Sequence, residues 1–131
     1  MKKKHSVTVI IPKGYKPSED ELWAAYIIAE TQGAEVKFIV PSNDYEQQTP
    51  DILVDGLAHE IKTPKSGKSN NVYTLLIGGA KQADILIVNA SKTPLSIDRI
   101  KSVARRVLNN KQSLEVVIII DRQGAISKVT R

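Results

Sequence analysis

An Asp-Gly pair at residues 55 and 56 lies between two apolar runs and restricts the possible folds of this chain more than any other feature. A two-residue type I′ turn needs positive φ at both central residues, and this pair supplies that at low energetic cost. The turn predicts a hairpin over residues 51–63 in which Val54 pairs with Leu57. Every other pair in the hairpin then follows by counting outward from the turn.

The same register sets two acidic residues against each other. It places Asp51 opposite Glu60, and strand alternation puts Lys62 on the same face as Glu60. Two unit charges ~5 Å apart repel by roughly 3 kcal/mol at an effective dielectric of 20. A hard divalent cation offsets this repulsion, and Mg²⁺ is typically held by one or two carboxylates together with water and substrate phosphates.

A lysine beside such a cation can orient or deprotonate water, or stabilise a developing phosphate charge. The hairpin therefore indicates a metal site for phosphodiester hydrolysis. The alternative interpretation is a solvated sheet edge on which Lys62 simply neutralises Glu60.

Composition limits the kind of metal site. The chain has 131 residues, enough for one domain with a substantial core, and it contains no cysteine. His5 and His59 are its only histidines, so we expect any metal to be bound by oxygen. His59 should face away from Glu60 as a partly buried packing residue. No apolar run approaches ~20 residues, which predicts no membrane span.

Positive charge gathers in the second half of the chain. The formal net charge is +5, and the sequence pI is near 9.5. Residues 1–65 hold 8 Lys/Arg and 10 Asp/Glu, a balance of −2, whereas residues 66–131 hold 11 and 4, a balance of +7. This favours a polyanionic partner bound by the basic half, although the same charge also serves solubility.

Periodicity and turn residues predict the order β-α-βββ-α-β-α-β-β. Ser18 and Glu21 fit a capping box at the start of the first helix, and Gly33 ends that helix. Its apolar face is expected at Leu22, Ala25, Tyr26 and Ala29, with Trp23 and Tyr26 in the core rather than stacking on bases. The other expected elements are strands at 6–11, 36–40, 84–89, 116–121 and 125–130 and helices at 70–82 and 96–109.

This order predicts an α/β fold with a mixed central sheet flanked by helices. We expect a single domain over residues 1–131, with an N-terminal strand and loop at 1–16, a core at 17–120 and a C-terminal strand at 121–131. Gly67-Lys68-Ser69 looks like part of a phosphate-binding loop, but the glycine required five residues earlier is missing. The sequence therefore excludes a Walker-type nucleotide site.

Asp51, Glu60 and Lys62 match the Pro-Asp…(Asp/Glu)-x-Lys pattern of restriction-endonuclease-like nucleases, and the middle of the chain has their αβββαβ core order. Within that superfamily, the stretch from Glu21 to about Ile120 resembles the C-terminal nuclease toxin domains of contact-dependent growth inhibition systems. The similarity lies in Thr-Pro-Asp-Ile-Leu-Val-Asp-Gly, His-Glu-Ile-Lys-Thr-Pro and Ala-Lys-Gln-Ala-Asp.

The resemblance implies a Mg²⁺- or Mn²⁺-dependent endonuclease that cleaves RNA, above all tRNA, in the cytoplasm of a target bacterium. It also implies delivery as the C-terminal part of a larger secreted or surface protein, and a cognate immunity protein that neutralises the toxin. The alternatives are a DNA endonuclease of the same superfamily, of restriction, repair or resolvase type, and a non-catalytic basic nucleic-acid-binding domain.

The resemblance also assigns roles to residues. Asp51 and Glu60 would bind the metal with the Ile61 carbonyl, and Lys62 would position the attacking water. Glu21 is the expected companion acid on the first helix, and Glu30 is the second choice. The residues expected to contact nucleic acid are Lys65, Lys68, Lys81, Gln82, Arg99, Arg105 and Arg106.

Overall fold

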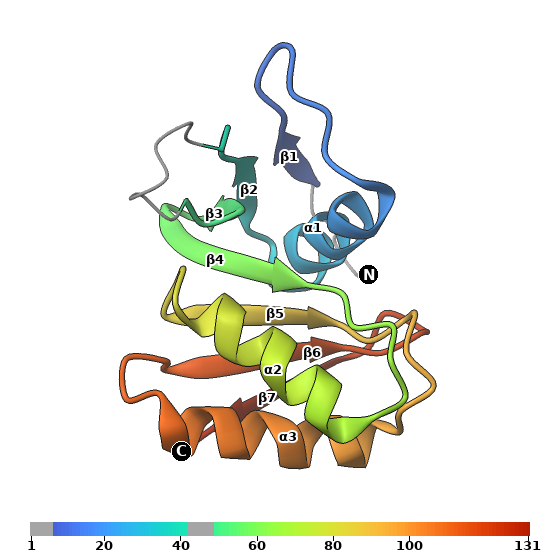
Figure 1. Ribbon diagram of the computed structural model, residues 1–131. Helices are drawn as coiled ribbons and strands as arrows, with labels where there is room; N and C mark the ends of the chain where they lie inside the picture. The colour runs from blue at the N-terminus through green and yellow to red at the C-terminus, as the bar shows by residue number, and fades with distance from the viewer. Residues whose placement is uncertain (1–6, 42–48) are drawn as a thin grey trace.

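The computed structural model describes residues 7–41 and 49–131. Within them, three helices and seven strands follow one another in the order expected from the sequence (Figure 1). The elements are β1 (Thr8–Ile10), α1 (Glu19–Gln32), β2 (Glu35–Phe38), β3 (Ile52–Val54), β4 (Leu57–Lys62), α2 (Ser69–Ala80), β5 (Ile85–Asn89), α3 (Ile97–Asn110), β6 (Val116–Ile120) and β7 (Ile126–Thr130).

The described strands form one mixed sheet whose spatial order is β1-β2-β3-β4-β5-β6-β7. The β1–β2, β4–β5 and β5–β6 pairs are parallel, and the others are antiparallel. This confirms the predicted mixed sheet flanked by helices. The parallel strands β5 and β6 are buried on both faces, which explains why they are almost entirely aliphatic.

Helices cover both faces of the sheet (Figure 1). α2 and α3 pack over one face, against Leu86, Val88, Val117 and Ile119. α1 covers the other face, against Val36, Phe38, Ile52, Ile61 and Ile87. Because successive strand residues alternate between faces, this assignment fixes which side each residue of β4 can reach.

The predicted hairpin is confirmed in detail. Asp55 has φ of 47° and Gly56 has φ of 84°, as a type I′ turn requires. Val54 pairs with Leu57. The Asp55 carboxylate also accepts a 2.8 Å hydrogen bond from the Glu35 N–H, so the turn is tied to the start of β2.

The first helix begins and ends as the sequence predicts, but its buried face is shifted. Ser18 and Glu21 form both hydrogen bonds of the capping box, and Gly33 adopts the left-handed conformation with φ of 61°. The prediction that Tyr26 lies on the buried face is wrong, because its side chain is 48% exposed. Apolar residues occur on nearly every side of α1, so periodicity could not locate the stripe. The buried residues are Ala24, Ala25, Ile28 and Ala29.

Candidate active site

Asp51 lies immediately before β3, at the point where that strand stops pairing with β4. Ile52 pairs with His59, and one residue further on the Asp51 Oδ2 accepts a 2.8 Å hydrogen bond from the Ile61 N–H. The backbone carbonyl of Asp51 accepts a second bond, at 3.0 Å, from the Ile39 N–H. The carboxylate is therefore held beside β4 by two strands and has little freedom to turn away.

Glu60 points into the layer between β4 and α2 and is buried, with 3% of its surface exposed. It pairs in register with Leu86, whose side chain belongs to the core beneath α2 and α3. The Asp51 and Glu60 carboxyls lie close enough for each to affect the pKa of the other, so the expected juxtaposition is present. Among the described residues, Glu60 Oε1 has no hydrogen-bond partner. Buried polar atoms rarely lack a partner, so this oxygen is notable.

Burial raises the pKa of Glu60 to about 8, with the Asp51 charge adding to the rise and the Lys62 ammonium opposing it. Burial also raises the pKa of Asp51, and Glu21 contributes, whereas the Ile61 N–H and Lys62 act in the opposite direction. Two carboxyls this close in a poorly solvated site cannot both ionise freely. The metal-free pair therefore holds a proton that an exposed pair would have lost.

This proton gives the metal-free protein a stability that falls as the pH rises. Folded Glu60 keeps its proton up to about pH 8, whereas in the unfolded chain a glutamate loses it near its ordinary pKa of 4.5. Between those values the folded state binds more protons, so each rise in pH favours unfolding. We expect the free energy of unfolding to drop by up to about 4 kcal/mol across this window. Urea titrations in EDTA at pH 5, 6.5 and 8 measure it, and Glu60→Gln should flatten the profile.

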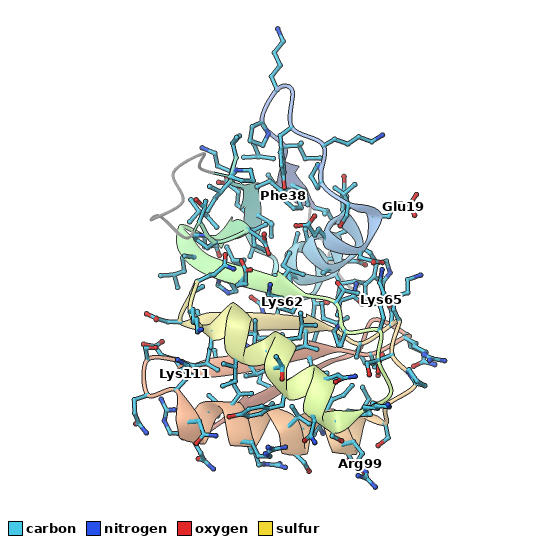
Figure 2. The ribbon with its side chains drawn as sticks, viewed as in Figure 1. Glu19, Phe38, Lys62, Lys65, Arg99 and Lys111 are labelled. Atoms are coloured by element: carbon cyan, nitrogen blue, oxygen red, sulfur yellow. The ribbon has the colours of Figure 1, made fainter. Side chains whose placement is uncertain are left out.

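Lys62 projects from β4 (Figure 2), and its Nζ is 3.6 Å from Glu60 Oε2. Its aliphatic stem packs on α2 at Gly79. A Cβ built on Gly79 would stand 3.1 Å from Lys62 Cγ and 2.7 Å from Leu86 Cδ1. The glycine thus leaves room for the lysine stem between helix and strand, an arrangement that no sequence pattern predicted.

Two adjacent glycines of α2 allow a matched test of this packing. We expect Gly78→Ala to raise the free energy of unfolding by up to about 1 kcal/mol, since alanine favours a helix and, apart from the adjoining residues and the helix's own backbone, no atom lies within 4 Å of the new methyl group. Gly79→Ala should instead destabilise the protein, because its methyl group meets Leu86 and the Lys62 stem. Thermal melts of the two variants measure the difference, and equal shifts would contradict the close approach.

Glu21 reaches the site from α1 while also capping that helix. Its Oε1 accepts a 3.0 Å hydrogen bond from the Ser18 N–H, and its charge raises the pKa of Asp51. The capping prediction is confirmed, and the functional role stays a prediction. Glu30 is exposed and lies nine residues further along the helix, about 13 Å from Glu21 at the usual rise per residue.

Tyr15 is a neighbour of the site that the sequence did not reveal. Its ring centroid lies 6.2 Å from that of Phe38, which pairs with Ile52 next to Asp51. Burial raises the pKa of Tyr15, and the charges of Glu21 and Asp51 add to the rise. Tyr15 occupies the loop before α1 and belongs to no motif, so no sequence signal could have marked it.

The residues expected to contact nucleic acid do not form one surface. Lys65 follows Lys62 by three residues and is 74% exposed. Its Nζ lies 3.9 Å from Asp20 Oδ2. Lys68 immediately precedes α2 and is exposed. Gln82 lines a hollow with Leu57 and Ala58. It therefore lies, with the adjacent Lys81, at the hairpin end of β4, two to three residues from Glu60.

The three arginines of α3 point in different directions. Arg106 lies over the Tyr73 ring at 4.4 Å, whereas Arg105 lines a hollow with Thr130 and Arg131. Arg99 projects outward at the other end of the helix (Figure 2). α3 packs on β6 and β7, so α2 separates its outer surface from β4. The structure therefore does not bring the arginines together with the carboxyl pair.

His59 faces away from the carboxyl pair, as expected. It is 4% exposed, and its Nδ1 lies 2.9 Å from the Leu57 carbonyl oxygen. Burial lowers its pKa. Within residues 7–41 and 49–131, no group of three or more His, Cys, Asp or Glu side chains is arranged to hold a metal ion. A metal at this site would thus have two carboxylates from the chain.

Comparison with known proteins assigns the chain to a family. The sequence profile of the contact-dependent growth inhibition CdiA C-terminal domain matches residues 47–126, which include both carboxylates and Lys62. The chain belongs to this family. It is thus a C-terminal toxin domain of contact-dependent growth inhibition, as the resemblance implied.

A solved structure shows the same fold. A chain of the CdiA-CT/CdiI toxin and immunity complex from Burkholderia pseudomallei matches with a TM-score of 0.64 and 19% sequence identity, over 95% of this chain and 99% of that chain. No curated protein matches the sequence. In the described part of this CdiA C-terminal domain, no helix is long and apolar enough to cross a membrane.

Proposed function

We propose that this domain is a metal-dependent nuclease toxin that hydrolyses phosphodiester bonds of RNA, with tRNA as its substrate. The observation that carries the proposal is the pairing of half-buried Asp51 with buried Glu60, with Lys62 beside them, in the spacing of restriction-endonuclease-like nucleases. Two repelling acids in a poorly solvated site destabilise a fold. A catalytic metal site would account for their presence there.

The carboxyl pair fits Mg²⁺ or Mn²⁺. Its donors are hard oxygens, and Glu60 Oε1 is a buried acceptor to which no described residue donates. Asp51 and Glu60 would hold the ion, with the Ile61 carbonyl as a third ligand and water and substrate phosphate completing the shell. When bound, the cation would neutralise the carboxylates and stabilise charge developing on the phosphate.

The chain's own residues would then position the reactants. Lys62 donates hydrogen bonds, and its stem is held between β4 and Gly79, so its ammonium can orient the attacking water and stabilise phosphate charge. Glu21 lies close enough to Asp51 to raise its pKa, which makes it the candidate for a further acid at the site. Lys65 and Lys68 lie on the loop that follows Lys62 and would contact the RNA backbone.

We further propose that a cognate immunity protein binds this domain, and that it is delivered as the C-terminal part of a larger protein to act in the cytoplasm of a target bacterium. Family membership supports delivery. The B. pseudomallei structure with the same fold is a toxin and immunity complex, which supports the partner.

Incubation with total tRNA and with supercoiled plasmid, in Mg²⁺ and in EDTA, tests the proposal. We expect tRNA to be cut in Mg²⁺ alone, and sequencing of the new ends would give the cleavage position. Plasmid cleavage with intact tRNA would instead identify a DNA endonuclease. If neither is cut and both are bound, the domain is a non-catalytic nucleic-acid-binding module.

A further inference from the structure

A hollow of about 310 Å³ opens where α1 begins and β5 ends. α1 contributes Glu19, Asp20 and Trp23 to its wall, the loop after β5 contributes Ser91 and Lys92, and the loop after β6 contributes Arg122. These are three segments far apart in the sequence. None of the hollow's residues belongs to the nuclease motif.

Trp23 gives the hollow an aromatic wall. Part of its side chain packs against the core beneath α1, and the rest borders the open space. Core packing alone, as expected from the sequence, therefore does not describe this residue. Stacking of a base on an aromatic side chain contributes substantially to the binding of a single strand, and any of the bases can stack in this way.

Both signs of charge line the hollow, from different elements. Glu19 and Asp20 come from α1, and Lys92 and Arg122 come from the loops after β5 and β6. A hydrogen bond of 3.0 Å from Arg122 to the Thr93 carbonyl holds the guanidinium in place. A nucleotide offers a partner to each sign, since its base edge carries amino donors and its phosphate is an anion.

A buried asparagine ties this hollow to the nuclease site. Lys62 pairs with Val88, and the next residue, Asn89, donates a 3.0 Å hydrogen bond to the Asp20 carbonyl. The Asn89 Oδ1 also accepts bonds from the N–H and hydroxyl of Ser91, at 3.1 and 2.6 Å. Ser91 follows Val88 by three residues, or ~10 Å of extended chain. Glu19 and Lys65 lie on the same side of the molecule, at the right in Figure 2.

We propose that this hollow is a nucleobase subsite that receives an unstacked base of a single-stranded segment beside the cleaved phosphate. The inference rests on the proposed nuclease function and adds how the substrate is held. Trp23 stacks on the base, the acidic residues accept hydrogen bonds from its edge, and Lys92 and Arg122 contact the adjoining phosphate. Single-stranded or flipped-out nucleotides are then preferred over continuous duplex.

Trp23 is the only tryptophan of the chain, so its fluorescence reports directly on the hollow. We would titrate the Glu60→Gln variant in EDTA, which prevents cleavage, with a single-stranded oligoadenylate. We expect saturable quenching of Trp23 emission. An abasic strand of the same length should bind more weakly through its phosphates and leave the emission unchanged. Binding of oligoadenylate, measured with labelled RNA, without any quenching would overturn the subsite.

Variants of the same chain separate stacking from packing. Trp23→Leu keeps an apolar group against the core, and we expect it to weaken oligoadenylate binding roughly 10-fold. Tyr26→Ala, on the exposed face of the same helix, should leave binding unchanged. If Trp23→Leu melts early, the exposed Lys92→Ala should still weaken binding about threefold and reduce its salt dependence. Unchanged affinity in both Trp23→Leu and Lys92→Ala would contradict the proposal.

The two proposals fail in different ways. If the wild-type protein cuts RNA in Mg²⁺ but oligoadenylate does not quench Trp23 in the binding experiment, the subsite is ruled out and the nuclease function stands. If oligoadenylate quenches Trp23 but the protein cuts no RNA in Mg²⁺, the hollow is a binding site for a base and the proposed nuclease function is ruled out.

Discussion

Asp51→Asn should abolish Mg²⁺-dependent RNA cleavage and, at the same time, make the metal-free protein more stable. The amide oxygen can still accept the Ile61 N–H, so the local structure is kept, but the charge that would bind the ion is gone. Loss of a stabilisation of about 4 kcal/mol corresponds to a roughly 10³-fold slower reaction. Removing the repulsion with Glu60 should stabilise the fold by roughly 1–3 kcal/mol at pH 8.

Single-turnover cleavage assays and urea denaturation in EDTA measure the two effects. Glu30→Gln is the matched control, since Glu30 is an exposed acid on α1 remote from Glu21, and it should change neither quantity. Residual Mg²⁺-dependent activity above a tenth of wild type in Asp51→Asn would show that this carboxylate is not a metal ligand.

Lys62→Met should remove cleavage but leave Mg²⁺ binding in place. The methionine keeps an unbranched apolar stem between β4 and Gly79 and loses only the ammonium group. Loss of a group that orients water or stabilises phosphate charge slows such reactions by about 10²–10³-fold. Isothermal titration with Mg²⁺ and single-turnover kinetics on RNA distinguish binding of the ion from the chemistry.

Lys65→Met provides the comparison, because Lys65 is 74% exposed and lies on the loop that follows Lys62. It should weaken RNA binding moderately without altering the cleavage rate at saturating RNA. If Lys62→Met lowered only the affinity for RNA, as Lys65→Met should, then Lys62 would be a phosphate contact with no part in the chemistry.

The parts of this fold that follow from local rules could be predicted. The Asp55-Gly56 turn sets the pairing of β3 with β4, because its positive φ values permit a single tight register. Ser18 and Gly33 bound α1 for equally local reasons, since each satisfies backbone groups at a helix end. The juxtaposition of Asp51 and Glu60 follows from that register and needs no knowledge of the rest of the fold.

What could not be predicted depends on contacts between distant segments. Tyr15 approaches Asp51 only because its loop folds over Phe38. The place of Trp23 at the hollow depends on where the loops after β5 and β6 come to lie. Arg106 was expected on a basic surface, but its position over the Tyr73 ring depends on how α2 packs against α3. Charge and periodicity in one segment do not contain such information.

The most direct test of the central claim is the rate of tRNA cleavage by the wild-type domain and by Glu60→Gln, each measured as Mg²⁺ is titrated into metal-free protein. We predict a rate for the wild type that rises from zero to saturation with Mg²⁺, and no cleavage by Glu60→Gln at any Mg²⁺ concentration although the variant is folded and binds RNA. Cleavage by the wild type that persists in EDTA, or equal rates for the two proteins, would contradict a metal-dependent nuclease built on Asp51, Glu60 and Lys62.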